Sequence, residues 1–180
     1  MRRFLGVVCS LAAMACSDSS PSSPEEFRSL ASILGPSANN SSLAPPIVYN
    51  TQMRSELESP ACASESKGHA HVKVNQDGTI DSDVTLNNKG GESVRFGHIH
   101  HLNQGAATGP IIWWLSSPLN TDLNLTDKHI VFHQQAVFVS NTHFASHAAA
   151  LAALLASPSE FYVNFHSDLC PGGFARGFLP

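Results

Sequence analysis

From Ile47 onward, the chain is divided into short runs in which apolar and polar residues alternate, and turn signals separate one run from the next. Successive side chains of a β-strand point to opposite faces of a sheet, so this alternation predicts strands with one buried face. Residues 76–79 (QDGT) and 87–91 (NNKGG) are sequences typical of turns. The pattern restricts the chain to an all-β domain built from many short strands.

We expect strands over residues 49–57, 69–74, 80–86, 94–101, 110–115, 161–166 and 174–179. Residues 130–132 and 136–139 form either two short strands or one bent strand. The Ala/Leu run over residues 145–156 predicts the single α-helix, because its leucines fall at helical spacing. Short strands at regular intervals predict a Greek-key β-sandwich or β-barrel with one short helix near residues 145–156.

The N-terminus has the features of an export signal over residues 1–15. Arg2 and Arg3 precede an apolar stretch, residues 4–15, that is too short to span a bilayer. Small residues stand before Cys16, and this arrangement resembles a bacterial lipobox. The resemblance implies cleavage before Cys16 and attachment of lipid to its sulfur. The alternative is a plain secretory signal cleaved near residue 15.

Residues 16–46 are rich in Ser, Pro and Asn and predict an extended tether, whereas residues 47–180 form the β domain. We therefore expect an extracytoplasmic protein of the bacterial cell envelope (periplasm, outer membrane or cell surface), held to a membrane through lipid on Cys16. Net charge is −4 and no basic cluster occurs, so a nucleic-acid partner is not expected.

Two of the four cysteines belong to the expected export signal: Cys9 lies inside it, and Cys16 is the expected lipidation site. Cys62 and Cys170 remain. An even pair in an exported domain predicts a disulfide that ties the start of the β domain to its last hairpin. Two free thiols are the alternative.

Two blocks of sequence stand out from the rest. The first comprises residues 97–101 (GHIHH) and 109–111 (GPI), and the second residues 161–168 (FYVNFHSD) and 171–179 (PGGFARGFL). They resemble the two signature blocks of the CHRD family, first described in chordin. The resemblance implies an immunoglobulin-like or superoxide dismutase-like β fold. It implies no particular chemical activity.

The last two expected strands are joined by residues 171–173 (PGG), which favour a tight turn because proline fixes φ and glycine permits conformations closed to other residues. Arg176 on the final strand is expected to pair with Asp168 or another acid.

All ten histidines lie between residues 69 and 166. His98 and His100 flank Ile99, so both point to the face of their strand opposite the core. His166 has the same parity on its own strand. If the two strands are neighbours, three imidazoles converge and can bind copper or zinc, with nitrogens roughly 3–4 Å apart. The alternative is structural, with the rings bonded to loop carbonyls.

The His98/His100 pair and a later strand histidine resemble the copper site of Cu/Zn superoxide dismutase, which lies outside a Greek-key barrel. No matching zinc loop follows His101, so dismutase activity is not expected. His69 and His71 form a second alternate pair, interpreted as part of a solvated strand face. The sequence lacks GxSxG, HExxH, CxxC and P-loop motifs, and we predict no catalytic residue.

Trp113 and Trp114 point in opposite directions if they lie on a strand. One is then a core residue, and the other either packs at the edge or offers a patch to a protein or carbohydrate partner. The favoured interpretation is a non-enzymatic binding or structural module. The alternative is a copper or zinc protein, either a carrier or a redox enzyme, that uses His98, His100 and His166.

Overall fold

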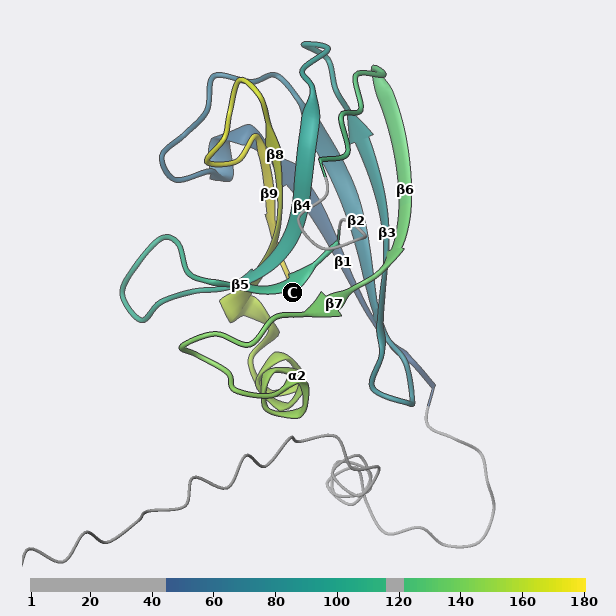
Figure 1. Ribbon diagram of the computed structural model, residues 1–180, viewed down its shortest axis with the longest axis vertical. Coiled ribbons are helices and arrows are strands. Elements are labelled where there is room, and N and C mark those ends of the chain that lie inside the picture. The colour runs from purple at the N-terminus through teal and green to yellow at the C-terminus, as the bar shows by residue number, and fades with distance from the viewer. Residues whose placement is uncertain (1–44, 116–121) are drawn as a thin grey trace, which may run out of the picture.

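The computed structural model describes residues 45–115 and 122–180, in which nine strands form one antiparallel sheet (Figure 1). The strands are β1 (Ile47–Arg54), β2 (Lys67–Val74), β3 (Ile80–Asn87), β4 (Val94–His101), β5 (Ile111–Trp114), β6 (His129–Gln135), β7 (Val137–Phe138), β8 (Phe161–Ser167) and β9 (Ala175–Phe178). The helical elements are η1 (Ser55–Leu57), α2 (His147–Ala156) and η2 (Pro158–Glu160). The predicted all-β class is confirmed. The expected signal and most of the expected tether lie outside the described residues.

The strands follow the order β6-β3-β2-β1-β9-β8-β4-β5-β7 across the sheet. The connections from β3 to β4 and from β5 to β6 therefore cross from one side of the sheet to the other. The edge strands β6 and β7 are consecutive in the chain and are separated only by Ala136, whose N–H donates to the carbonyl of Ile80 at 2.7 Å. The sheet consequently curls into a nearly closed barrel (Figure 1).

Several expected boundaries differ from the observed ones by one to three residues, and two of these shifts have clear local causes. β1 ends at Arg54 because its partner at that point, Lys67, is the first residue of β2, so no paired strand remains beyond it. The chain turns there into η1. α2 begins at His147, since Ser146 is extended and its hydroxyl oxygen accepts the N–H of Ala149 at 3.2 Å, which makes Ser146 the N-cap.

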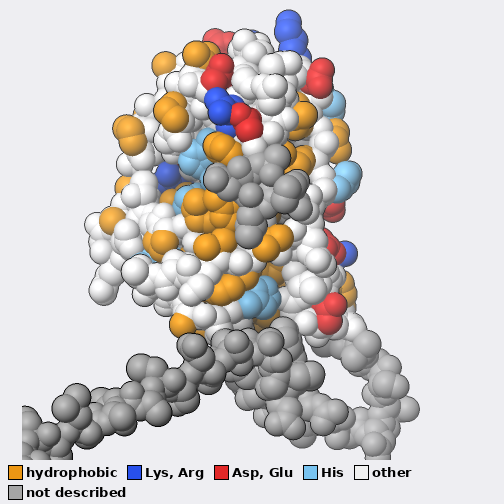
Figure 2. Space-filling model, in the orientation of Figure 1, with side chains coloured by type: hydrophobic (Ala, Val, Ile, Leu, Met, Phe, Trp, Pro, Cys, Tyr) orange, Lys and Arg blue, Asp and Glu red, His pale blue; other side chains and the backbone are white. Residues whose placement is uncertain are grey.

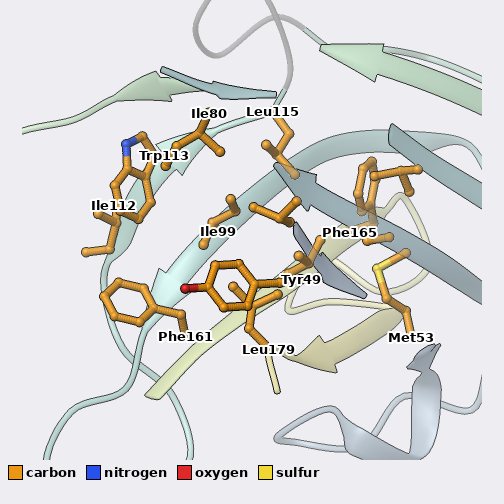
Figure 3. Packing of buried hydrophobic residues seen from close by; sticks show 14 of the residues in the cluster. Tyr49, Met53, Ile80, Ile99, Ile112, Trp113, Leu115, Phe161, Phe165 and Leu179 are labelled. Carbon is orange, nitrogen blue, oxygen red and sulfur yellow. The ribbon is translucent and has the colours of Figure 1, made fainter. Parts of the chain in front are cut away.

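The core lies inside the curled sheet and is formed by alternate residues of its strands (Figure 3). Met53, Ile99, Trp113 and Phe165 have essentially no exposed surface. The helix α2 lies at the end of the barrel near β5 and β7, where it buries Leu154 (Figure 1). Within residues 45–115 and 122–180, no helix combines the length and the apolar character needed to cross a membrane.

Strand β8 departs from simple alternation, because every residue except the half-buried His166 is buried. Its outer face is covered by three irregular segments: residues 55–66 after β1, residues 102–110 between β4 and β5, and residues 168–174 between β8 and β9. Each segment contributes a polar contact to the side chains beneath it. The candidate site lies on strands β4 and β8, beneath these segments.

Candidate metal centre

The three histidines predicted to converge do lie together. His98 and His100 are on β4, His166 is on β8, and these strands are antiparallel neighbours. One ring nitrogen from each can be chosen so that all three lie within 4.8 Å of one another. Ring centroids are 4.9 Å apart for His98 and His166 and 5.4 Å apart for His98 and His100. The 4.8 Å limit includes the roughly 3–4 Å expected for nitrogens that share an ion.

Strand parity places the rings opposite the core, as expected, but this face is not open to solvent. His98 is 3% exposed and His100 is 8% exposed, whereas His166 is half-buried. Residues 102–110 and the β8–β9 turn cover the face. Alternation along a strand identifies the face but carries no information on which loops fold over it.

Backbone carbonyls fix the orientation of two of the rings. Nδ1 of His100 lies 3.0 Å from the carbonyl oxygen of Gly109, and Nδ1 of His166 lies 2.8 Å from that of Pro171. A carbonyl oxygen can only accept a hydrogen bond, so each Nδ1 must carry the proton. Nε2 of a neutral ring is then left with a free lone pair, which is the tautomer that a metal ligand requires.

Four nitrogens of the cluster are buried and have no hydrogen-bond partner among the described residues: Nε2 of His100, Nε2 of His166 and both nitrogens of His98. A buried polar atom without a partner destabilises a fold by about 1–3 kcal/mol. Such atoms are uncommon in folded proteins and call for an explanation. Their concentration at one point makes this cluster the candidate functional site.

Burial keeps all three rings uncharged at neutral pH. Desolvation, together with the neighbouring rings of His166 and His100, lowers the pKa of His98 to about 2. Desolvation likewise lowers the pKa of His100 to about 4, against the opposing effect of its bond to Gly109. The pKa of His166 is lowered mainly by burial. The rings therefore need not lose protons before binding a cation.

A buried ion pair lies beside the cluster on the β9 side of β8. Arg176 Nε donates to Glu58 Oε2 at 3.1 Å, and the Asn164 amide donates to the same oxygen at 2.9 Å. The side chain of Arg176 is 2% exposed. Burial raises the pKa of Glu58 to about 7, although Arg176 and Asn164 act in the opposite direction. Arg176 also donates to the carbonyl of Ala107 at 2.7 Å and so holds the β4–β5 loop in place.

Tyr162 connects this ion pair to the histidines. Its ring lies parallel to the His100 ring, with centroids 4.9 Å apart, and the Arg176 guanidinium carbon lies 4.2 Å from its centroid. β4 and β9 flank β8, so the two groups approach Tyr162 from opposite sides. The Tyr162 hydroxyl oxygen accepts a hydrogen bond from the N–H of Gly109 at 3.3 Å. The carbonyl of the same glycine orients His100.

Arg176 pairs with an acid, as expected, but Asp168 is not that acid. Asp168 Oδ1 accepts the N–H of Ser93 at 2.9 Å. The partner is Glu58, 118 residues before Arg176 in the chain, and no feature of its surrounding sequence indicates this role. Tyr162 and Asn164 could be found from the sequence, because they share the parity of His166.

The remaining seven histidines do not join the cluster. They are His69, His71, His101, His129, His133, His143 and His147. His147 is structural, since its Nδ1 accepts from the Trp113 indole at 3.0 Å and its Nε2 lies 2.8 Å from the carbonyl oxygen of Gly78. His101 and His143 bond to each other through their Nδ1 atoms. Throughout the part of the chain that the structure describes, one group alone has three potential ligand residues at this spacing.

Trp113 and Trp114 point in opposite directions, as predicted. Trp113 is fully buried in the core. Trp114 is half-buried and packs edge-to-face on His98, with ring centroids 4.2 Å apart. The second indole therefore forms part of the wall of the histidine cluster.

The predicted disulfide joins Cys62 to Cys170, whose Cα atoms are 6.1 Å apart. Cys170 immediately precedes Pro171, so the bond secures the turn whose carbonyl orients His166. The predicted lipidation residue, Cys16, lies outside the described residues.

Lys and Arg side chains are scattered on the face shown in Figure 2.

No match was found among curated proteins or among solved structures. The family model of the CHRD domain matches residues 49–179. This range includes both sequence blocks, all three clustered histidines and both cysteines of the disulfide. It also contains Tyr162, Asn164 and Arg176, which surround the cluster. The chain therefore belongs to the CHRD domain family.

Proposed function

We propose that this CHRD domain is an exported, non-enzymatic binding module that holds one copper or zinc ion between His98, His100 and His166. The observation that carries the proposal is the convergence of unpartnered ring nitrogens from all three residues. Imidazole nitrogens are common ligands of both metals. A purely structural role would use both nitrogens of a ring in hydrogen bonds, as His147 does.

The hydrogen bonds of the rings select the ligand atoms. Gly109 and Pro171 occupy the Nδ1 side of His100 and His166, so Nε2 is the ligand atom of each. Either nitrogen of His98 can serve, because both are unpartnered. The two carbonyls act as outer partners that orient the ligands, an arrangement common in metal sites. A bound ion would lie near 2 Å from each of the three nitrogens, the usual metal–nitrogen distance.

Enclosure favours binding over catalysis. Residues 102–110 and the β8–β9 turn cover the rings, and β4 and β8 lie beneath them. His98 and His100 are almost completely buried. A substrate would need an open route to the ion, whereas a bound ion is retained better behind such a cover. A carrier or storage role therefore fits the geometry better than the redox enzyme considered as an alternative.

The proposal places the module outside the cytoplasm. The CHRD domain and the disulfide between Cys62 and Cys170 are compatible with an extracellular location. Lipid on Cys16 would hold the protein at a membrane, and residues 16–46 would separate the domain from the bilayer.

Metal analysis of the purified full-length chain tests this function. After exposure to copper or zinc and removal of excess ion, we expect one bound ion per chain by inductively coupled plasma mass spectrometry. His166→Ala should abolish retention because it removes one of three ligands. His129→Ala is the matched control, since His129 is exposed on β6, and it should retain the ion.

Two results would overturn the metal assignment. One is a parent chain that retains neither ion. The other is a folded His166→Ala variant, verified by circular dichroism, that binds as much metal as the parent. Either result would leave the rings with a structural role only.

A further inference from the structure

The charges around the three histidines bear on which ion the cluster could hold. The charged or titratable groups that act on the rings are the other rings and the Arg176 guanidinium, and no carboxylate is among them. Arg176 is held in place by its bonds to Glu58 and Ala107. The nearest permanent charge that the ion would meet is therefore positive.

The buried acid beside the cluster does not supply a carboxylate to the rings. Glu58 Oε2 accepts from both Arg176 and Asn164, and Glu58 is not among the groups that shift the pKa values of the three histidines. Asn164 lies opposite His98 in the β4–β8 register, and its Oδ1 is an unpartnered acceptor. An amide oxygen is neutral. An ion bound to three neutral imidazoles would keep its full formal charge in a buried position.

Electrostatics then discriminates strongly between ions of different charge. The cost of moving an ion out of water rises with the square of its charge, so a dication costs about four times as much as a monocation of similar size. The energy of repulsion between the ion and a fixed cation such as Arg176 is also twice as large for a dication as for a monocation. Binding sites for zinc commonly include thiolates or carboxylates that reduce this cost.

We propose that the site is selective for copper(I) over Zn²⁺ and Cu²⁺. This inference rests on the proposed function and specifies its ion. Copper(I) carries one charge, and its filled d shell is satisfied by three nitrogen ligands without an anion. The aromatic side chains beside the cluster add to this preference. The Trp114 and Phe96 ring centroids lie 4.2 Å and 6.2 Å from that of His98. Neither side chain can accept a hydrogen bond from a water bound to the metal.

Competition between ions tests the selectivity directly. The full-length chain is equilibrated without oxygen with equal concentrations of Zn²⁺ and of copper kept as copper(I) by ascorbate, then desalted and analysed for both metals. We expect copper to occupy the site at one ion per chain, with zinc essentially absent. Titration with bicinchoninate, which absorbs visible light when it binds copper(I), gives the affinity.

A pair of variants at Phe96 tests the electrostatic cause. Phe96 lies opposite His166 in the register of β4 and β8, and its side chain is half-buried, so a polar substitute can reach solvent. Phe96→Glu adds one negative charge beside the rings, whereas Phe96→Gln changes shape similarly without charge. Relative to the Gln variant, the Glu variant should bind Zn²⁺ on the order of tenfold to a hundredfold more tightly. Its gain for copper(I) should be smaller.

The outcomes separate this inference from the proposed function. If zinc displaces copper(I) in the parent chain and His166→Ala abolishes binding of both, the site exists but its selectivity for copper(I) is refuted. Equal gains for both ions in Phe96→Glu would refute the electrostatic cause. If neither ion binds the parent, the proposed function fails and this inference fails with it.

Discussion

At the scale of single residues, buried His98 and His100 make the stability of the metal-free chain sensitive to acid. Their folded pKa values, about 2 and about 4, lie below the ordinary 6.5, so the unfolded chain takes up protons first as pH falls. Stability is therefore lost below about pH 6.5. Each ring should cost about 2 kcal/mol of unfolding free energy by pH 5. Urea denaturation at pH 7 and pH 5 measures this loss, and equal stability at both would contradict it.

Glu58 acts in the opposite direction and supplies an internal check on that prediction. Its folded pKa is about 7 against an ordinary 4.5, so between these values the folded chain holds the proton more strongly and gains stability as pH falls. Glu58→Gln removes this gain. The variant should lose stability between pH 7 and pH 5 more steeply than the parent, whatever its stability at pH 7. A shallower loss would show that Glu58 is not protonated in the fold.

The residues of the site differ in how far sequence predicts them. Strand parity predicted that His98, His100 and His166 lie on the outer faces of their strands, because alternation is a local property. It did not predict that β4 and β8 are neighbours, which brings the three rings together. Parity also predicted the outer position of Tyr162. Burial of the rings was not predictable, since it depends on loops whose path is set by distant contacts. Glu58 illustrates this limit, because a pairing across 118 residues leaves no periodic signal in the chain.

At the scale of elements, the loop between β4 and β5 orients His100, one of the proposed ligands, through the carbonyl of Gly109. A side chain at this glycine would place its Cβ 1.8 Å from the carbonyl oxygen of His101, so the loop backbone would have to move. We expect Gly109→Ala to weaken metal binding at least tenfold and to lower the melting temperature.

Gly172→Ala is the matched control for that substitution. Gly172 lies in the β8–β9 turn, where an added Cβ meets no atom within 4 Å. Metal titration and thermal unfolding of both variants measure the difference. Wild-type affinity in Gly109→Ala would show that the loop does not orient His100.

The helix and most strands were predictable from the sequence. Errors arose where strand pairing, rather than the propensity of the residues, decides where a strand ends. The alternating pattern correctly indicated the strands that became β2, β3 and β4. It continued past Arg54, where β1 ends, because the pattern of side chains does not reveal where a partner strand begins. The choice between one bent strand and two short ones was resolved at Ala136, which joins opposite edges of the sheet.

At the scale of the whole molecule, the arrangement of the chain predicts a domain held near a membrane. Cys16 precedes the tether over residues 16–46, and the β domain follows. Cys16→Ser should remove incorporation of labelled fatty acid and shift the protein from the membrane fraction to the soluble fraction. A parent chain without label, together with unchanged membrane retention of the variant, would contradict lipid anchoring.

The bond between Cys62 and Cys170 imposes an order on the events in the life of this chain. It joins the segment that carries Glu58, which contacts Asn164, to the turn that carries Pro171, which orients His166. Thiols stay reduced in a typical cytoplasm, so if the chain is exported as proposed, it lacks this constraint until it reaches an oxidising compartment. Oxidation would therefore precede ion capture. A protein still inside the cell would compete poorly for cytoplasmic metal, and only the exported form would acquire its ion.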